Sequence, residues 1–143
     1  MMDIIPGMRA SSSALTAERI RMEVTAQNIA NALTRRGPDG KPYERQQVVF
    51  QSVLDKHSRG SGSSPRTGAP TQNLVVARIE KDPRPPRLVP DPAHPGLLVA
   101  EPVISIHEEM VDYIAASRAY EANLAMVRSA RTLAIQTMNI GKR

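Results

Sequence analysis

Apolar residues recur at helical spacing in a segment near the start of the chain. Residues 8–33 contain no proline or glycine, and apolar side chains follow at seven-residue intervals at Met8, Leu15, Met22 and Ile29. Ala26 and Leu33 extend this row at four-residue steps. A seven-residue apolar repeat is typical of a helix that packs against other helices. The pattern predicts a helix of roughly 39 Å, with Arg35 and Arg36 suiting its C-terminal end and Gly37–Pro38 stopping it.

A second helix is predicted close to the other end of the chain. Ser105 and Glu108 have the spacing of a capping box, in which the serine hydroxyl accepts from the backbone three residues later. Residues 106–140 contain no proline or glycine, and Gly141 follows as a helix stop. Such a helix is roughly 52 Å long.

Two apolar rows follow this second helix. One contains Tyr113, Tyr120, Val127 and Ala134, joined at four-residue steps by Leu124 and Met138. The other contains Ala119, Met126, Leu133 and Ile140. One row would serve a partner helix in the same chain, so two rows indicate a helix that is contacted from more than one side.

The middle of the chain differs in kind. Eleven of the twelve prolines lie between Pro38 and Pro102. Residues 43–54 and 74–80 resemble strands, and they predict a small hairpin. The Ser, Gly and Pro content of residues 58–70 indicates a flexible linker. The proline-rich stretches 82–87 and 90–95 are expected to be stiff, extended connectors.

These patterns together predict a mainly α protein. Its long terminal helices would pack as a coiled-coil-like pair, with a small irregular β element and a proline-rich linker between them. The corresponding divisions are helical segments at 1–36 and 105–143 and a β or irregular middle at 37–104. Only four residues are aromatic, so a large globular core is not expected.

Charge and composition reduce the number of functions that the chain could have. The net charge is +5, and residues 35–87 alone carry eleven basic and five acidic side chains. This leaves open a helical module that binds an anionic polymer through its basic middle. Nucleic acid is not expected, because the basic residues are scattered and lack aromatic stacking platforms. With no cysteine, thiol catalysis and cysteine-bound metal are excluded.

No residues have the spacing of a catalytic or metal site. His57, His94 and His107 lie in a linker, a connector and a helix start. His107 and Glu108 lack the second histidine of a metalloprotease helix, and no glycine loop joins a strand to a helix. We therefore expect no enzyme activity, cofactor, metal or small-molecule substrate.

Asn28 and Asn31 share one face of the first predicted helix. Asparagine is a mediocre helix former, so the pair could simply prepare the helix end. Alternatively, the two amides could form hydrogen bonds across a helix–helix interface and set its register. The sequence does not choose between these alternatives.

Several motifs resemble the axial rod and hook proteins of the bacterial flagellum. The first is Ala26-Gln-Asn-Ile-Ala-Asn-Ala32, close to the N-terminus and on a heptad helix. Five further motifs narrow the similarity to proximal rod proteins. They are residues 13–19, residues 40–50, Asp91-Pro-Ala-His-Pro95, Glu109-Met-Val111 and Ala116-Ser-Arg-Ala-Tyr-Glu-Ala-Asn-Leu124. The order of the motifs and the chain length also agree with that family.

The resemblance implies a structural subunit that polymerises into the proximal rod of the basal body and carries motor torque toward the hook and filament. It implies passage through the flagellar type III export apparatus without a cleaved signal peptide, and a rod that crosses the periplasm. The implied partners are other copies of the chain, proximal and distal rod proteins, and ring or adapter components at the rod base. The expected assembly interface consists of Met8, Leu15, Met22, Ala26, Asn28, Ile29, Asn31, Leu33, Met110, Tyr113, Tyr120, Asn123, Leu124, Met126, Val127, Leu133 and Ile140.

Overall fold

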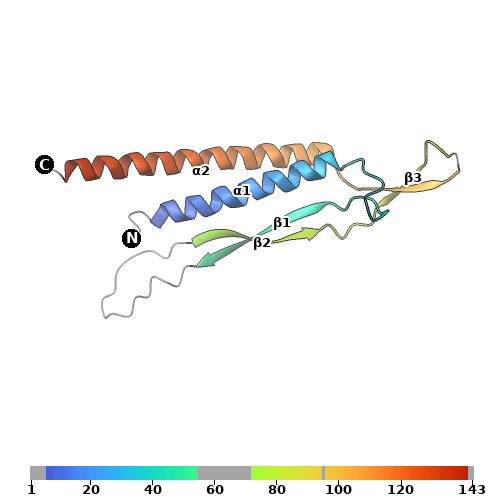
Figure 1. Ribbon diagram of the computed structural model, residues 1–143, viewed down its shortest axis with the longest axis horizontal. Helices are drawn as coiled ribbons and strands as arrows, with labels where there is room; N and C mark the ends of the chain where they lie inside the picture. Colours follow the sequence, from blue (N-terminus) through green and yellow to red (C-terminus); the bar gives the residue numbers. More distant parts are fainter. Residues whose placement is uncertain (1–5, 55–71, 95, 142–143) are drawn as a thin grey trace.

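Two long helices and two small antiparallel hairpins make up the computed structural model (Figure 1). The structure describes residues 6–54, 72–94 and 96–141. The expected flexible linker at 58–70 lies outside these residues. The elements in chain order are α1 (Pro6–Ala30), β1 (Gln46–Leu54), β2 (Gln72–Lys81), β3 (Arg87–Pro90), β4 (Leu98–Glu101) and α2 (Ile106–Ile140).

Helix α1 lies in the middle of a three-layer arrangement. It contacts α2 on one side and the β1–β2 hairpin on the other. The helices run antiparallel, and the β3–β4 hairpin projects from the end where α1 stops and α2 begins (Figure 1). The chain is therefore mainly α, with small antiparallel sheets between the two helices in sequence.

The helix ends follow the local sequence signals in part. The backbone N–H of Glu108 donates to Ser105 Oγ at 3.4 Å, and the N–H of Gly141 donates to Thr137 O at 3.2 Å. The first helix ends earlier than expected, at Ala30, and continues into a turn at residues 31–33. The prediction that Arg35 and Arg36 suit the helix end is wrong, because α1 ends at Ala30 and has no basic residue in its last turn. The Arg35 guanidinium donates instead to Glu101 at the end of β4.

The expected hairpin is present, and a second one was missed. Strands β1 and β2 pair from Gln46↔Lys81 to Leu54↔Gln72, with a bulge where Val49 is followed by Phe50. Strands β3 and β4 pair from Arg87↔Glu101 to Pro90↔Leu98. Arg87 and Pro90, expected in extended connectors, thus belong to a strand. Four-residue strands bounded by prolines give too short a periodic signal to be recognised.

The apolar core is small. The fully buried apolar side chains of the described residues are Ala17, Val24, Ala32 and Ala116. These small side chains remove little apolar surface from water, and burial of apolar area is the main favourable contribution to folding. Contacts other than apolar packing must therefore fix the helices and hairpins relative to one another.

Helix α2 is ten residues longer than α1, since the two have 35 and 25 residues. Its C-terminal end extends beyond the start of α1 along the long axis of the molecule (Figure 1). A helix of this length gains most of its stability from tertiary packing. Packing therefore supports the first part of α2 more than the last.

Hydrogen exchange of the monomeric chain should show this difference. We expect backbone amides in residues 110–125 to exchange at least tenfold more slowly than those in 131–140, because only the first group belongs to the part of α2 alongside α1. Mass spectrometry of deuterated peptides measures both segments in one sample. Equal protection along the whole of α2 would contradict this expectation.

Candidate functional site: a polar junction and the uncovered face of α2

Asn28 joins three elements through one side chain. Its amide nitrogen donates to the Gln46 carbonyl at 2.8 Å and to Glu109 Oε2 at 2.9 Å. Its amide oxygen accepts from the Gln46 N–H at 2.9 Å and from the Tyr43 hydroxyl at 3.1 Å. With only 1% of its surface exposed, Asn28 uses its full hydrogen-bonding capacity. It therefore fixes α1 to the start of β1 and to the first turn of α2.

Glu109 is the buried charge of this junction. It is 2% exposed, and its second carboxylate oxygen accepts from Arg45 Nε at 2.6 Å and from Arg45 Nη2 at 2.5 Å. A buried carboxylate is tolerated only when it is paired and hydrogen-bonded. The Glu109 carboxylate and burial together raise the pKa of Tyr43, with burial the larger cause. The Tyr43 hydroxyl thus keeps the proton that it donates to Asn28.

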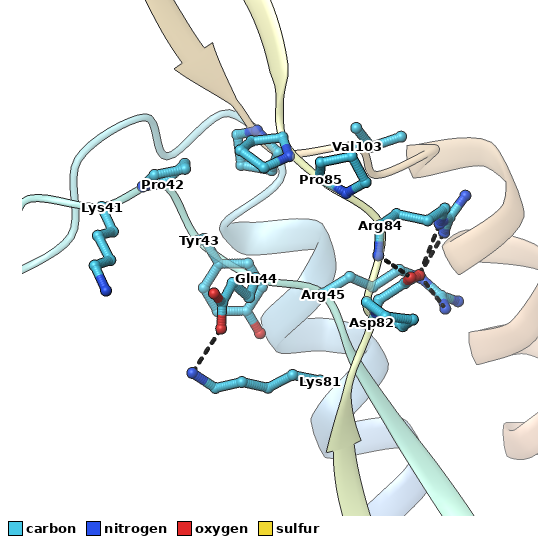
Figure 2. Close-up of a pocket in the computed structure, with 13 residues that line it drawn as sticks. Lys41, Pro42, Tyr43, Glu44, Arg45, Lys81, Asp82, Arg84, Pro85 and Val103 are labelled. Atoms are coloured by element: carbon cyan, nitrogen blue, oxygen red, sulfur yellow. Dashed lines mark hydrogen bonds and ion pairs between the residues drawn. The ribbon is translucent and has the colours of Figure 1, made fainter.

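Asp82 and Arg84 extend the junction to the chain that follows β2. Figure 2 shows the Arg84 and Arg45 side chains on either side of the Asp82 carboxylate. Arg84 Nε and Nη2 donate to Asp82 Oδ2 at 2.9 and 2.6 Å, and Arg45 Nη1 lies 3.7 Å from the same oxygen. Hydrogen bonds from the Arg84 side chain and backbone N–H hold the pKa of Asp82 below its ordinary value. We call Asn28, Tyr43, Arg45, Asp82, Arg84 and Glu109 the polar junction.

A second ion cluster fixes the β3–β4 hairpin. Glu101 is buried at the end of β4, where one oxygen accepts from Arg35 Nη2 at 3.1 Å and the other from Arg87 Nη2 at 3.2 Å. These hydrogen bonds, first that of Arg35 and then that of Arg87, lower the pKa of Glu101. The cluster ties the hairpin to the loop that follows α1.

The two interpretations of the asparagine pair each hold for one residue. Asn31 Nδ2 donates to Gln27 O of its own helix at 2.9 Å, and Asn31 Oδ1 accepts from Thr34 Oγ1 at 3.3 Å. Asn31 thus finishes the helix end, whereas Asn28 forms long-range hydrogen bonds. Those bonds reach a strand as well as the second helix, which the sequence did not indicate.

An open groove of about 540 Å³ lies beside the polar junction (Figure 2). Its walls combine prolines and Val103 with charged side chains such as Lys81, which pairs with Glu44 at 2.6 Å. Within residues 6–54, 72–94 and 96–141, no cluster of three or more His, Asp or Glu side chains is arranged to hold a metal ion. Five charged side chains of the groove take part in ion pairs, namely Glu44, Arg45, Lys81, Asp82 and Arg84.

Most basic side chains in the described part of the middle segment form ion pairs. Six of its basic side chains contact a carboxylate, namely Arg35, Arg45, Arg78, Lys81, Arg84 and Arg87. Two of the carboxylates, Glu101 and Glu109, lie after the basic segment in sequence. Paired cations offer less charge to an anionic polymer, so this arrangement does not favour a polymer-binding module.

The apolar row predicted on α1 lies at the edge of its buried side. Leu15, Met22 and Ile29 are half-buried, as is Asn31, while Ala26 and Leu33 are exposed. The fully buried positions are Ala17, Val24, Thr25 and Asn28. Met8 belongs to α1, but its side chain lies outside the described part. The buried row contains small and polar residues, which an apolar pattern does not reveal.

The two rows predicted on α2 differ in exposure. In the first row, Tyr120, Leu124, Val127 and Ala134 are half-buried, whereas Tyr113 and Met138 are exposed. In the second row, Met126, Leu133 and Ile140 are exposed by 65%, 62% and 77%. Met110 is also exposed, and Asn123 is half-buried with its amide donating to Ala119 O. Ala119, the first residue of this row, is half-buried. From Met126 onward the second row is not covered by the described residues of the subunit.

Sequence reasoning missed most of the polar junction. Arg45, Asp82 and Glu109 are separated by tens of residues, and no local spacing connects them. Tyr43, Arg45 and Glu109 lie in two of the motifs quoted above, but those motifs did not indicate that the residues meet.

No described helix is long and apolar enough to cross a membrane.

The contrast between Asn28 and Asn31 provides a matched test. Asn28→Ala should lower the free energy of unfolding by about 3 kcal/mol, because it leaves Tyr43, Gln46 and Glu109 with unsatisfied buried groups. Asn31→Ala should lower it by about 0.5 kcal/mol or less, because the lost bonds are local. Urea unfolding of both variants followed by circular dichroism measures the difference. Similar losses would show that Asn28 has no special place in the fold.

Acid should remove the contribution of Glu101. Its pKa is lower in the folded chain than in the unfolded chain, so its stabilising effect is complete above the unfolded value of about 4 and is lost as pH falls through the folded value. The difference in unfolding midpoint between the wild type and Glu101→Gln should be largest at pH 7 and shrink below pH of about 4. Arg35→Gln should weaken the same pH dependence. A difference that is constant with pH would contradict the ion cluster.

Comparison with known proteins identifies the family. Residues 8–35 match the family described as "Flagella basal body rod protein", and residues 104–140 match "Flagellar basal body rod FlgEFG protein C-terminal". The chain is 38% identical to the flagellar basal-body rod protein FlgC of Borreliella burgdorferi, over 92% of this chain and 93% of that protein. It is 37% identical to FlgC of Yersinia enterocolitica, with the same shares, and 31% identical to FlgC of Bacillus subtilis, over 94% and 96%. The chain therefore belongs to the FlgC family of flagellar basal-body rod proteins.

Proposed function

We propose that this chain polymerises into the proximal rod of the flagellar basal body and transmits motor torque to the distal rod, hook and filament. The family is one of structural rod proteins and not of enzymes. The family gives the general role, and the uncovered face of α2 supports the more specific one.

The observation that carries the proposal is the exposed apolar row of α2. Met126, Leu133 and Ile140 repeat every seven residues on a helix whose other row is half-buried from Tyr120 to Ala134. A row of large apolar side chains in water is the mark of a surface that becomes covered. The seven-residue spacing places the three side chains on one side of the helix, so one surface of a neighbouring subunit can cover them.

We assign different roles to the divisions predicted from the sequence. The helical segments 1–36 and 105–143 would pack with those of neighbouring subunits around a central channel. The middle segment 37–104 would contribute to an outer layer. The order of layers in the subunit is consistent with this, because the β1–β2 hairpin covers α1 and leaves the far side of α2 open.

The polar junction suits a subunit that carries torque. Apolar contacts are non-directional and allow layers to slide, whereas hydrogen bonds and hydrogen-bonded ion pairs fix an orientation. Asn28 and Glu109 join α1, β1 and α2 at one place, so a twisting force on the helices reaches the hairpin through directional bonds.

The proposed partners follow from this role. They are other copies of the chain, further proximal and distal rod proteins, and ring or adapter components at the rod base. Delivery through the flagellar type III apparatus, without a cleaved signal peptide, would bring the chain to a rod that crosses the periplasm. A small apolar core is compatible with export in an unfolded state, because little packing has to be undone.

A complementation experiment tests the proposal. Cells lacking the gene should produce basal bodies that stop at the membrane ring, as seen by electron microscopy, and the wild-type gene should restore rods and swimming. Met126→Asp should fail to restore either, because it places a charge in the proposed interface. The position is exposed in the free subunit, so the substitution should not disturb the fold itself.

Gln51→Asp is the matched control, since it adds the same charge at an exposed position of β1. It should restore swimming to at least half of the wild-type level. Complete rods in the deletion strain would refute the proposed function. Normal rods with Met126→Asp would refute the role of the α2 face.

A further inference from the structure

The C-terminal part of α2 is an uncharged apolar projection. Residues 132–140 contain no ionisable side chain, although charged residues make up 23% of the whole chain. Leu133 and Ile140 are exposed by 62% and 77%, and Ile135 and Met138 by 49% and 59%. This segment lies beyond the described start of α1, at one end of the long axis (Figure 1). We call residues 132–140 the α2 extension.

The β3–β4 hairpin presents a second uncharged apolar surface at the opposite end of the molecule (Figure 1). Leu88 is paired with Ala100 and Pro90 with Leu98, so these four side chains share one face of the ribbon. Leu88 and Leu98 are exposed by 62% and 63%. We call this the outer face of the hairpin.

The opposite face of the hairpin is already engaged. It contains Val89, Val99, Arg87 and Glu101, of which Val89 and Val99 are half-buried and Glu101 is held by Arg35 and Arg87. The ion cluster therefore fixes the hairpin with its leucines directed away from the contact. A rigid apolar face of this kind is preorganised for a partner.

We propose that the α2 extension of one copy packs on the outer face of the β3–β4 hairpin of the next copy. This inference rests on the proposed function and names a contact within the polymer. Both surfaces are apolar and uncharged, so their contact would bury no unpaired charge. Their lengths also agree, since nine helical residues and four pairs of strand residues each span about 13 Å.

The placement of the two surfaces determines what this contact builds. They lie at opposite ends of an elongated subunit, so the same contact repeats from copy to copy. A contact between two different surfaces that does not close into a ring generates an open polymer. A rod requires an open polymer, whereas a contact between two identical surfaces would end at a dimer.

Cross-linking in assembled basal bodies tests the contact. The chain has no native cysteine, so the introduced thiols are its only thiols. Cells carrying Leu98→Cys with Leu133→Cys in one chain are treated with a short bismaleimide, and isolated basal bodies are examined by denaturing electrophoresis. We expect a ladder of dimers and higher multimers. Each substitution expressed alone should give no cross-linked product.

Co-expression of the two single variants tests whether residue 98 of one copy lies beside residue 133 of another copy. It should give cross-linked dimers and nothing larger, because each chain then has one reactive thiol. Ile79→Cys combined with Leu133→Cys is the matched control, since Ile79 is an exposed apolar residue of the other hairpin, and it should give no product. If the Leu98 and Leu133 substitutions reduce swimming, the pair Leu88→Cys and Ile140→Cys examines the same contact, because Ile140 lies in the same apolar row of α2 as Leu133.

The outcomes separate this contact from the proposed function. Rods that contain the chain but give no cross-link with either pair would overturn the contact and leave the proposed function intact. A cross-link between two Leu98→Cys chains, or to a different rod protein, would also overturn it by identifying another occupant. Complete rods in the deletion strain would overturn the proposed function itself.

Discussion

The four hydrogen bonds of Asn28, together with the Glu109–Arg45 ion pair beside them, hold together a fold that has almost no apolar core. The fully buried apolar side chains are few and small, and the β1–β2 hairpin is too small to be stable alone. The helices and the hairpin need the junction to take up a defined orientation. A buried polar network that is fully satisfied specifies one arrangement, because every displaced alternative leaves a donor or acceptor unpaired.

The same junction explains why one helix surface remains uncovered. Asn28 holds the β1–β2 hairpin against α1, on the side away from α2. No described strand reaches the outer face of α2, and its second apolar row stays exposed. In a globular domain this exposure would be a liability. In the proposed polymer, neighbouring subunits would cover this row.

The sequence predicted the elements of this fold better than their contacts. Helix α2, its cap at Ser105 and the β1–β2 hairpin follow from local spacing, which acts within a few residues. The β3–β4 hairpin escaped because its strands are four residues long and bounded by prolines. The junction escaped because Asn28 and Glu109 are 81 residues apart, and only the folded chain brings them together. The apolar rows indicated which helices have partners, but the buried row of α1 consists of small and polar residues that periodicity does not select.

The large sequence separation within the junction also orders the events of folding. The partners of Asn28 lie at residues 43–46 and at residue 109, so a chain that emerges N-terminus first cannot satisfy this side chain until most of its length is free. Forming such long-range contacts carries the entropy cost of closing a long loop. Until Glu109 arrives, α1 and the first hairpin carry an incomplete hydrogen-bond network and remain easy to unravel. Because Glu109 lies so late in the sequence, the fold cannot be completed until α2 has begun to emerge.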